Sequence, residues 1–176
     1  TRGIQLFLEY FDNPEANARF EKYWGQKLDT KPGLTVVEIM DAACEGKIRG
    51  MYVLGENPAM SDPNARHARE GLAKLEHLVV QDIFLTETAY LADVILPASA
   101  FPEKNGSFSN TDRTVQMGRQ ALRPPGDARQ DLWIIEQIAN KLGCGWNYAH
   151  VSEVFDEMRH TMPSIGGITW ERLERD

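Results

Sequence analysis

The sequence predicts an α/β fold in which helices cover both faces of an open, mostly parallel sheet. Three short apolar, β-rich segments at 48–54, 77–81 and 93–96 alternate with segments that have helical spacing. Strands spaced in this way pair in parallel through crossover helices. The 176 residues, of which 42% are hydrophobic, are enough to bury one continuous core without disulfides or metals.

The first fifty residues contain sequence patterns that are typical of the starts and ends of helices. Asn13 is expected to cap a helix that starts at Pro14 and runs to about residue 24, followed by a polar loop over 26–33. Thr35-Val-Val-Glu38 is a capping box that opens a second helix, with a stop at Gly46. Cys44 falls on the apolar face of this helix, so it is expected to pack there as a small buried side chain.

Between and after the strands, further helices are expected. The helix between the first two strands is predicted to start at Ser61-Asp-Pro63, and Thr86 to cap a short turn. Residues 101–116 predict an irregular loop or hairpin. Asp127-Ala-Arg-Gln130 is interpreted as a second capping box that opens a helix ending at Gly143. Ser152 is predicted to cap a further helix that ends before Pro163, and residues 169–175 are predicted to form a last short helix.

Charge and composition exclude several classes of function. The net charge is −7 and no run of Lys or Arg overrides it, so nucleic-acid binding is disfavoured. No apolar run reaches the roughly 18 residues that a membrane span needs. Cys44 and Cys144 cannot by themselves ligate an iron–sulfur cluster or structural zinc. We expect a reducing, cytoplasmic location, with the periplasm as the alternative, and the missing initiating Met suggests excision from a longer chain.

Polar residues follow the predicted strands, where ligands of open parallel sheets bind. Gly55 permits close backbone approach, Asn57 can donate and accept, and a helix is expected to begin just after them. Asp82 follows the second strand and could bind ribose hydroxyls. The alternative is that Asn57 and Asp82 only cap turns or helices. Likewise Lys104 could be a solvated loop lysine, and Asp131 could serve only the helix dipole.

No self-sufficient active site is visible. The chain has neither a Gly-x-x-x-x-Gly-Lys-Ser/Thr phosphate loop nor a Gly-x-Gly-x-x-Gly fingerprint. The four histidines show no metal-ligand spacing with each other or with the cysteines. We therefore predict no catalytic residue and no metal ligand in this chain.

Several long segments resemble the molybdopterin oxidoreductase family, and within it the formate dehydrogenase branch. They are Met51-Tyr-Val-Leu-Gly-Glu-Asn-Pro-Ala-Met-Ser-Asp62, Leu78-Val-Val-Gln-Asp-Ile-Phe-Leu-Thr-Glu-Thr-Ala89, Ala92-Asp-Val-Ile-Leu-Pro-Ala-Ser99 and Glu103-Lys-Asn-Gly-Ser-Phe-Ser-Asn-Thr-Asp-Arg113, then Val115-Gln116 and Asp131. Such segments in a fixed order are more specific than any single motif. The resemblance covers residues 33–175 closely and the first thirty loosely.

The resemblance implies a dinucleotide-binding-like domain, of the kind found as domains 1–3 of formate dehydrogenase and DMSO reductase, inside a catalytic subunit that oxidises formate to CO2. We expect residues 1–176 to form one such domain, with a helical lead-in over 1–32 and a core over 33–176. It would hold one arm of a bis-molybdopterin guanine dinucleotide cofactor that carries molybdenum or tungsten. By similarity Asp82 would bind ribose, Lys104 the phosphate or pterin end, and Asp131 the guanine edge. The implied cofactor-binding residues are Gly55, Asn57, Ser61, Gln81, Asp82, Lys104 and Asp131.

The family's metal-ligating Cys or selenocysteine with its His, and the cysteines of its [4Fe–4S] cluster, do not occur in this chain. The isolated chain is therefore expected to be inactive. Implied partners are the remaining domains of the same subunit and iron–sulfur, flavin or membrane electron-transfer subunits.

Three alternatives stay open at this point. The first is the same domain from a nitrate reductase or the large subunit of an NADH:quinone oxidoreductase. The second is a non-catalytic nucleotide-binding scaffold. The third is a domain that only makes subunit contacts, which should expose an apolar patch of several hundred Å².

Overall fold

A computed structural model describes residues 13–29 and 31–175. The chain divides into two compact units, one of residues 34–151 and one that joins residues 1–33 with 152–176. The last segment of the chain therefore groups with the lead-in and not with the sheet. The expectation of a single domain with a core over 33–176 stays a prediction.

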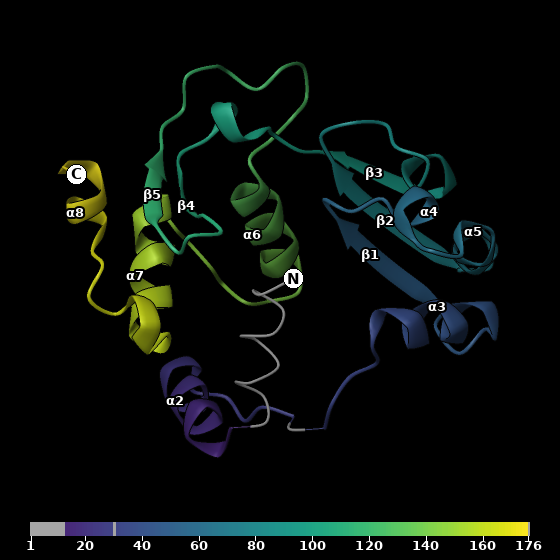
Figure 1. Ribbon diagram of the computed structural model, residues 1–176, viewed down its shortest axis with the longest axis horizontal. Coiled ribbons are helices and arrows are strands. Elements are labelled where there is room, and N and C mark those ends of the chain that lie inside the picture. Colours follow the sequence, from purple (N-terminus) through teal and green to yellow (C-terminus); the bar gives the residue numbers. More distant parts are fainter. Residues whose placement is uncertain (1–12, 30, 176) are drawn as a thin grey trace. The chain divides into compact units, whose positions relative to one another are not determined.

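The larger unit is built on a parallel sheet of three strands (Figure 1). Its order is β1 (Gly50–Leu54), β2 (His77–Asp82) and β3 (Val94–Pro97). In the register Val53 lies beside Val80, and Val80 beside Ile95. Each expected strand is thus present within two residues of its predicted ends. The prediction of an α/β fold with an open parallel sheet is confirmed.

One face of the sheet carries the core of this unit. The helices over it are α4 (Pro58–Ser61) and α5 (Ala65–Ala73), followed later by the short turn η1 (Ala89–Leu91). Their side chains meet those of β1 and β2 in one cluster, which consists of Val53, Ala59, Leu72, Leu78, Val80 and Ala89. Burying a side chain such as Leu72 contributes about 1.5–3 kcal/mol. Helix α3 (Val36–Cys44) packs in turn against α5.

Helix boundaries here follow the side chains that cap them. Thr35 and Glu38 form the predicted capping box of α3. The predicted helix start at Ser61-Asp-Pro63 is wrong, because a four-residue helix ends at Ser61 and α5 begins after Asn64, whose side chain accepts from His67 N.

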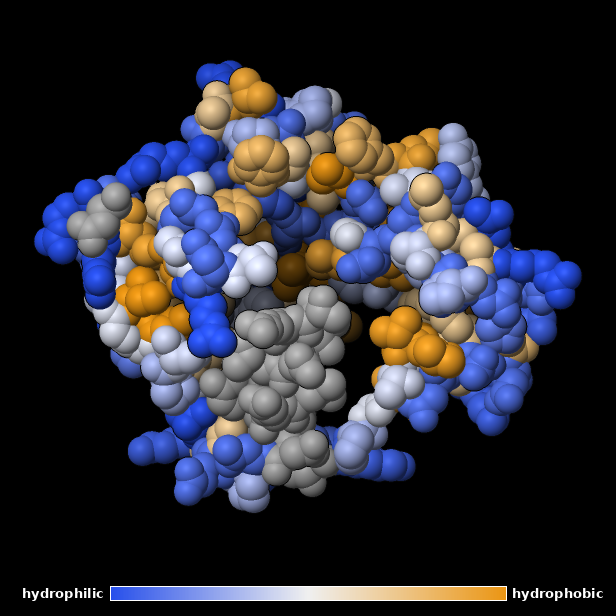
Figure 2. Space-filling model, viewed as in Figure 1, coloured by the Kyte–Doolittle hydropathy of each residue, from blue (hydrophilic) through white to orange (hydrophobic). Residues whose placement is uncertain are grey.

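The surface of α3 also differs from expectation. Cys44 is only half-buried and its sulfur contacts His67, so the prediction of a buried apolar position is wrong. Val36 and Val37, at the start of the helix, are 64% and 68% exposed. Figure 2 shows the apolar patch that this leaves over α3.

The second face of the sheet is only partly covered. Tyr52, Leu54 and Val94 lie on it and are 42%, 42% and 38% exposed. Helix α6 (Asp131–Lys141) reaches this face at the strand ends, where Asp131 bonds to Gln81. Gln130 precedes α6 without a side-chain cap, so the second predicted capping box is wrong.

A β-hairpin follows the sheet. The turn η2 (Phe101–Glu103) leads into β4 (Gly106–Ser109), which pairs antiparallel with β5 (Val115–Gly118). This confirms the expected hairpin. Its tip contains Arg113 at φ 72, a left-handed conformation that is uncommon for residues other than Gly.

The smaller unit is helical. It contains α2 (Pro14–Trp24), α7 (Val151–Thr161), the turn η3 (Pro163–Ile165) and α8 (Trp170–Arg175). Asn13 caps α2 as predicted, since its Oδ1 accepts from Glu15 N and Ala16 N. Arg19 Nε donates to Thr161 O at 2.8 Å, and the rings of Phe155 and Trp170 meet edge-on with centroids 5.8 Å apart. These contacts hold α2, α7 and α8 together.

Candidate functional site

Gln81, the fully buried penultimate residue of β2, organises the carboxyl end of the sheet. Its backbone oxygen accepts from Gly55 N at 2.9 Å. Its side-chain Nε2 donates to Asp131 Oδ1 at 2.7 Å, and its Oε1 accepts from the hydroxyl of Tyr52. A buried amide needs partners for both of its ends, and Gln81 has them. The ends of β1 and β2 and the start of α6 are therefore tied at one residue.

Asp131 also receives the ammonium group of Lys104. Lys104 Nζ donates to Asp131 Oδ2 and to the carbonyl oxygen of Ser99, the latter at 2.9 Å. The two side chains are about a quarter exposed, 26% for Lys104 and 27% for Asp131. They form a hydrogen-bonded ion pair that solvent still reaches, so their outer atoms are available to a ligand.

Ser99 adds an unusual feature to this region. Its side chain is 1% exposed, and no described residue offers its buried Oγ a hydrogen bond. A buried hydroxyl without a partner costs free energy, typically about 1–3 kcal/mol. Because Lys104 bonds to the carbonyl of the same residue, this orphaned hydroxyl belongs to the same region as the ion pair.

Tyr52 completes the network from β1. Burial, and after it the negative charge of Asp131, raise the pKa of the Tyr52 phenol above its ordinary value. The hydroxyl therefore stays protonated at neutral pH and can donate to Gln81. We call Tyr52, Gln81, Ser99, Lys104 and Asp131 the strand-end network.

Asn57 has a different set of partners. Its Oδ1 accepts from Thr88 N at 3.1 Å and from Thr88 Oγ1 at 2.8 Å, while its Nδ2 donates to Glu87 at 2.7 Å. Thr88 is fully buried and also accepts from Ala59 N. Asn57 thus clamps the loop after β1 to the loop after β2 and does not cap α4 with its side chain.

The other predicted residues lie around these two groups. Asp82 closes a turn, since its Oδ1 accepts from Ile83 N at 2.7 Å and from Phe84 N at 3.3 Å. Gly55 adopts φ 63 directly after β1, a conformation that suits glycine. Ser61 is the exposed last residue of α4. Helix α4 begins just after Asn57 as expected, has only four residues and starts with Pro58, which lacks an N–H; anion binding at its start stays a prediction.

The structure therefore brings Gln81, Lys104 and Asp131 into direct contact, with Gly55 joined through the backbone. Asn57 and Asp82 lie at the same strand ends but bond to other partners, and Ser61 ends α4. Sequence analysis missed Tyr52, Ser99 and Thr88. Tyr52 could have been found, because it lies two residues before the end of β1 on the face that also carries Gln81. Ser99 and Thr88 gave no signal beyond following a strand.

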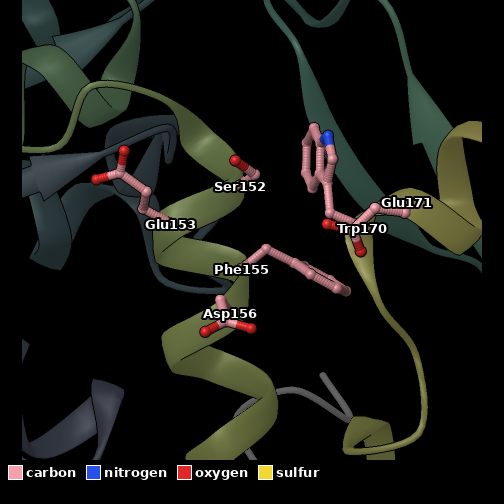
Figure 3. Close-up of a pocket in the computed structure, with 6 residues that line it drawn as sticks. All are labelled: Ser152, Glu153, Phe155, Asp156, Trp170 and Glu171. Atoms are coloured by element: carbon pink, nitrogen blue, oxygen red, sulfur yellow. The ribbon is translucent and has the colours of Figure 1, made fainter.

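A cavity of about 310 Å³ lies in the smaller unit, between α7 and α8 (Figure 3). Phe155 and Trp170 form its apolar wall, and its polar lining consists of Ser152, Glu153, Asp156 and Glu171. None of the predicted cofactor-binding residues lines it. Within residues 13–29 and 31–175, no cluster of three or more His, Cys, Asp or Glu could hold a metal ion. The helices in this part of the chain are too short or too polar to cross a membrane.

Comparisons with known proteins show which family and which proteins the chain is similar to. The family model described as molybdopterin oxidoreductase matches residues 10–141, which is more than half of the chain. The chain is 48% identical to the F420-dependent formate dehydrogenase subunit alpha of Methanocaldococcus jannaschii, over 89% of this chain and 24% of that protein. It is 45% identical to YrhE of Bacillus subtilis, named as a candidate formate dehydrogenase, over 94% of this chain and 17% of that protein. The chain thus spans a quarter or less of the length of these relatives.

A solved structure shows the same fold. Acetylene hydratase from Pelobacter acetylenicus superposes on 92% of this chain and 23% of its own, with a TM-score of 0.65 and 22% identity. The match of the family model over more than half of the chain establishes that the chain belongs to the molybdopterin oxidoreductase family.

Proposed function

We propose that the chain is the part of a formate dehydrogenase catalytic subunit that binds one guanine dinucleotide arm of a bis-molybdopterin guanine dinucleotide cofactor. The relatives at 48% and 45% identity bear names of formate dehydrogenases, which favours this branch over nitrate reductases. The observation that carries the proposal is the direct contact of Gln81 and Lys104 with the carboxylate of Asp131.

The chemistry of this carboxylate fits a guanine. A carboxylate has about four acceptor positions. Gln81 and Lys104 each use one at Asp131, and its side chain remains 27% exposed. The remaining lone pairs can accept the two N–H groups of a guanine edge. Because both neighbours fix the carboxylate, little rotational freedom is lost when a ligand binds.

The orphaned hydroxyl of Ser99 fits a polar ligand as well. It belongs to the residue whose carbonyl oxygen accepts from the ammonium group of Lys104. A phosphate or a pterin amide would give Ser99 Oγ the partner that it lacks. In this proposal Lys104 faces the phosphate or pterin end of the cofactor, and Asp82 binds the ribose. The backbone of the dinucleotide is contacted by Gly55, Asn57 and Ser61.

The bound cofactor, with molybdenum or tungsten, supplies the two-electron oxidation of formate to CO2 in the family's formate dehydrogenases. The residues of this chain contribute binding and orientation, and none is assigned a catalytic role. We therefore expect purified chain to show no formate-dependent dye reduction. Measurable reduction would contradict this part of the proposal.

The proposal requires further parts of the enzyme. The remaining domains of the subunit would complete the cofactor site and ligate the [4Fe–4S] cluster, and iron–sulfur, flavin or membrane subunits would carry electrons away. Ile83, Phe84 and Leu85 follow β2 and are 47%, 74% and 55% exposed. Contiguous apolar surface of this kind is typical of a contact with another domain. A cytoplasmic location remains part of the proposal.

The decisive experiment replaces Asp131 by Asn in the intact subunit and measures the GMP that acid releases per subunit, together with the bound metal. Asp127→Asn is the matched control, because Asp127 is an exposed carboxylate in the loop just before α6. We expect Asp131→Asn to lower the GMP content at least about tenfold, a loss of roughly 1.4 kcal/mol, and Asp127→Asn to leave it unchanged. Normal GMP content in Asp131→Asn would overturn the proposal.

A second experiment, on the purified chain, distinguishes the formate dehydrogenase domain from a nucleotide-binding scaffold. A scaffold that binds free nucleotide predicts that the purified chain binds GMP tightly in calorimetry, whereas a domain that holds one arm of a larger cofactor binds it weakly. Tight GMP binding without any metal in the intact subunit would therefore support the scaffold and contradict the formate dehydrogenase assignment.

A further inference from the structure

Helices α3 and α5 bring a thiol, an imidazole and a carboxylate into one line of contacts. Cys44 Sγ lies 3.5 Å from His67 Nδ1. The other ring nitrogen, Nε2, lies 2.8 Å from Asp41 Oδ1. These three residues lie outside the strand-end network, and nothing in the proposed cofactor function uses them.

The carboxylate determines what His67 can do. An ionised carboxylate can only accept, so Nε2 of the neutral ring carries the proton and donates it to Asp41. Nδ1 then has its lone pair on the side of Cys44 Sγ. This is the arrangement in which an oriented imidazole acts as a base for a thiol nucleophile.

The surroundings of the sulfur act in opposite directions. Gly71 of α5 packs closely against it, since a Cβ there would lie only 3.1 Å from Cys44 Sγ, so the sulfur is covered on this side. Lys74 Nζ donates to the carbonyl of Cys44 at 2.8 Å and brings a positive charge to the residue. Against this, Cys44 is the last residue of α3, where the helix dipole disfavours a thiolate. Proton transfer to His67 therefore has to offset the unfavourable effect of the helix dipole on the thiolate.

The other charged groups on these helices have partners of their own. The contacts are Arg66 with Glu70, Glu45 with Lys47, Glu38 with Thr35, and Arg69 with the carbonyl of Ala59. None of these contacts involves Cys44 or His67. The local electrostatics are thus set by Asp41, His67 and Lys74.

We propose that Cys44 is a histidine-assisted thiol that small hydroperoxides oxidise to a sulfenic acid. His67 Nδ1 takes the thiol proton, and the sulfur attacks the hydroxyl oxygen of the peroxide. The S–O bond forms as the O–O bond breaks, and the leaving alkoxide, which is hydroxide for hydrogen peroxide, takes the proton from Nδ1 to give an alcohol or water. Sulfur loses two electrons and the peroxide gains them. The 35% exposure of the His67 side chain gives a small oxidant access.

A purely structural role is the competing explanation. Cys44 Sγ also lies 3.3 Å from the carbonyl oxygen of His67, so the thiol could donate there and only join the two helices. In that case the half-buried Cys44 should react more slowly than the exposed Cys144. The two cysteines of the chain thus provide an internal comparison.

The test treats the reduced full chain with hydrogen peroxide at pH 7, traps sulfenic acid with dimedone, and follows each cysteine by peptide mass spectrometry. We expect initial modification of Cys44 to be at least about tenfold faster than that of Cys144. His67→Gln should bring the rate of Cys44 to that of Cys144 or below it, without changing Cys144. Asp41→Asn should give a smaller loss, because the ring is held less firmly.

His77→Gln is the matched control, since His77 is also exposed to solvent near a carboxylate, that of Asp93 at 3.9 Å. It should leave both rates unchanged. Equal or slower reaction of Cys44 in the unaltered chain would overturn the proposal without any variant. An unchanged rate in a folded His67→Gln variant, checked by circular dichroism, would overturn it as well.

Discussion

Gln81 Nε2 donates to Asp131 Oδ1 at 2.7 Å, although 50 residues of chain separate them. The bond joins the end of a buried strand to the first residue of α6. Because the Gln81 side chain is fully buried and also accepts from Tyr52, its loss removes one hydrogen bond from each of two partners.

Gln81→Leu tests how much this hydrogen bond contributes to the stability of the fold. A leucine of similar size cannot bond to Asp131 or Tyr52, so the free energy of unfolding should fall by about 1–3 kcal/mol. Urea denaturation measures it. Gln137→Leu, at an exposed position of α6, is the control and should change stability by less than about 0.5 kcal/mol. Equal effects of the two substitutions would contradict the role assigned to Gln81.

Thr88→Val tests the clamp between the two strand-end loops. Valine keeps the shape but loses the hydroxyl that bonds to Asn57 and Ala59 N. We expect a loss of about 1–3 kcal/mol in unfolding free energy. Thr111→Val, at the exposed hairpin tip, should be neutral in the same denaturation assay. Full stability of Thr88→Val would show that Asn57 alone holds the loops.

Glu38→Gln tests the capping box through pH. Hydrogen bonds from Thr35 N and Oγ1 lower the pKa of Glu38 below its ordinary value of 4.5. The folded state therefore favours the carboxylate, and its contribution is present above pH 4.5 and is lost as the pH falls through the lowered pKa. The stability difference between the unaltered chain and Glu38→Gln should narrow on acidification, and denaturation at several pH values measures it. Glu56→Gln, an exposed site, serves as control; a difference that grows at low pH would have the wrong sign.

Arg113→Gly tests the strained hairpin tip. Arg113 has φ 72, which costs energy for a residue with a Cβ and little for glycine. We expect the substitution to raise the unfolding free energy by about 0.5–1 kcal/mol, after allowing for the added freedom of the unfolded chain. Ser109→Gly, within β4, should instead lower it. A loss of stability in Arg113→Gly would mean that its side chain forms contacts stronger than the strain.

The strands were predictable because each is a short apolar segment that ends at Gly, Asp or Pro, as at Gly55 and Pro97. The two predicted capping boxes show where a local sequence pattern no longer determines the start of a helix. Thr35 and Glu38 bond as expected, whereas Asp127 and Gln130 have the same spacing but do not cap α6. The bridge between Ala98 and Arg129 holds this segment extended, so tertiary pairing prevails over a local signal.

The candidate site was predictable in its members but not in its contacts. The resemblance to the family nominated Gln81, Lys104 and Asp131, whereas residue type and position alone left Lys104 and Asp131 with ordinary structural roles and did not single out Gln81. The partners of Asn57 depend on Thr88, which is brought near by a loop with no distinctive pattern. The contact of Cys44 with His67 likewise depends on how α3 packs on α5, and spacing along the chain carries no information about that.

The separation of Gln81 from Asp131 has a consequence for the order of assembly. A ribosome delivers the three strands and their core side chains before α6 exists, and closing so long a loop carries an entropic cost that only a formed sheet can offset. In the nascent chain the side-chain amide of Gln81 is therefore hydrogen-bonded to water until Asp131 has been synthesised. A pause or truncation between these two positions would leave a folded sheet with its polar end unfinished.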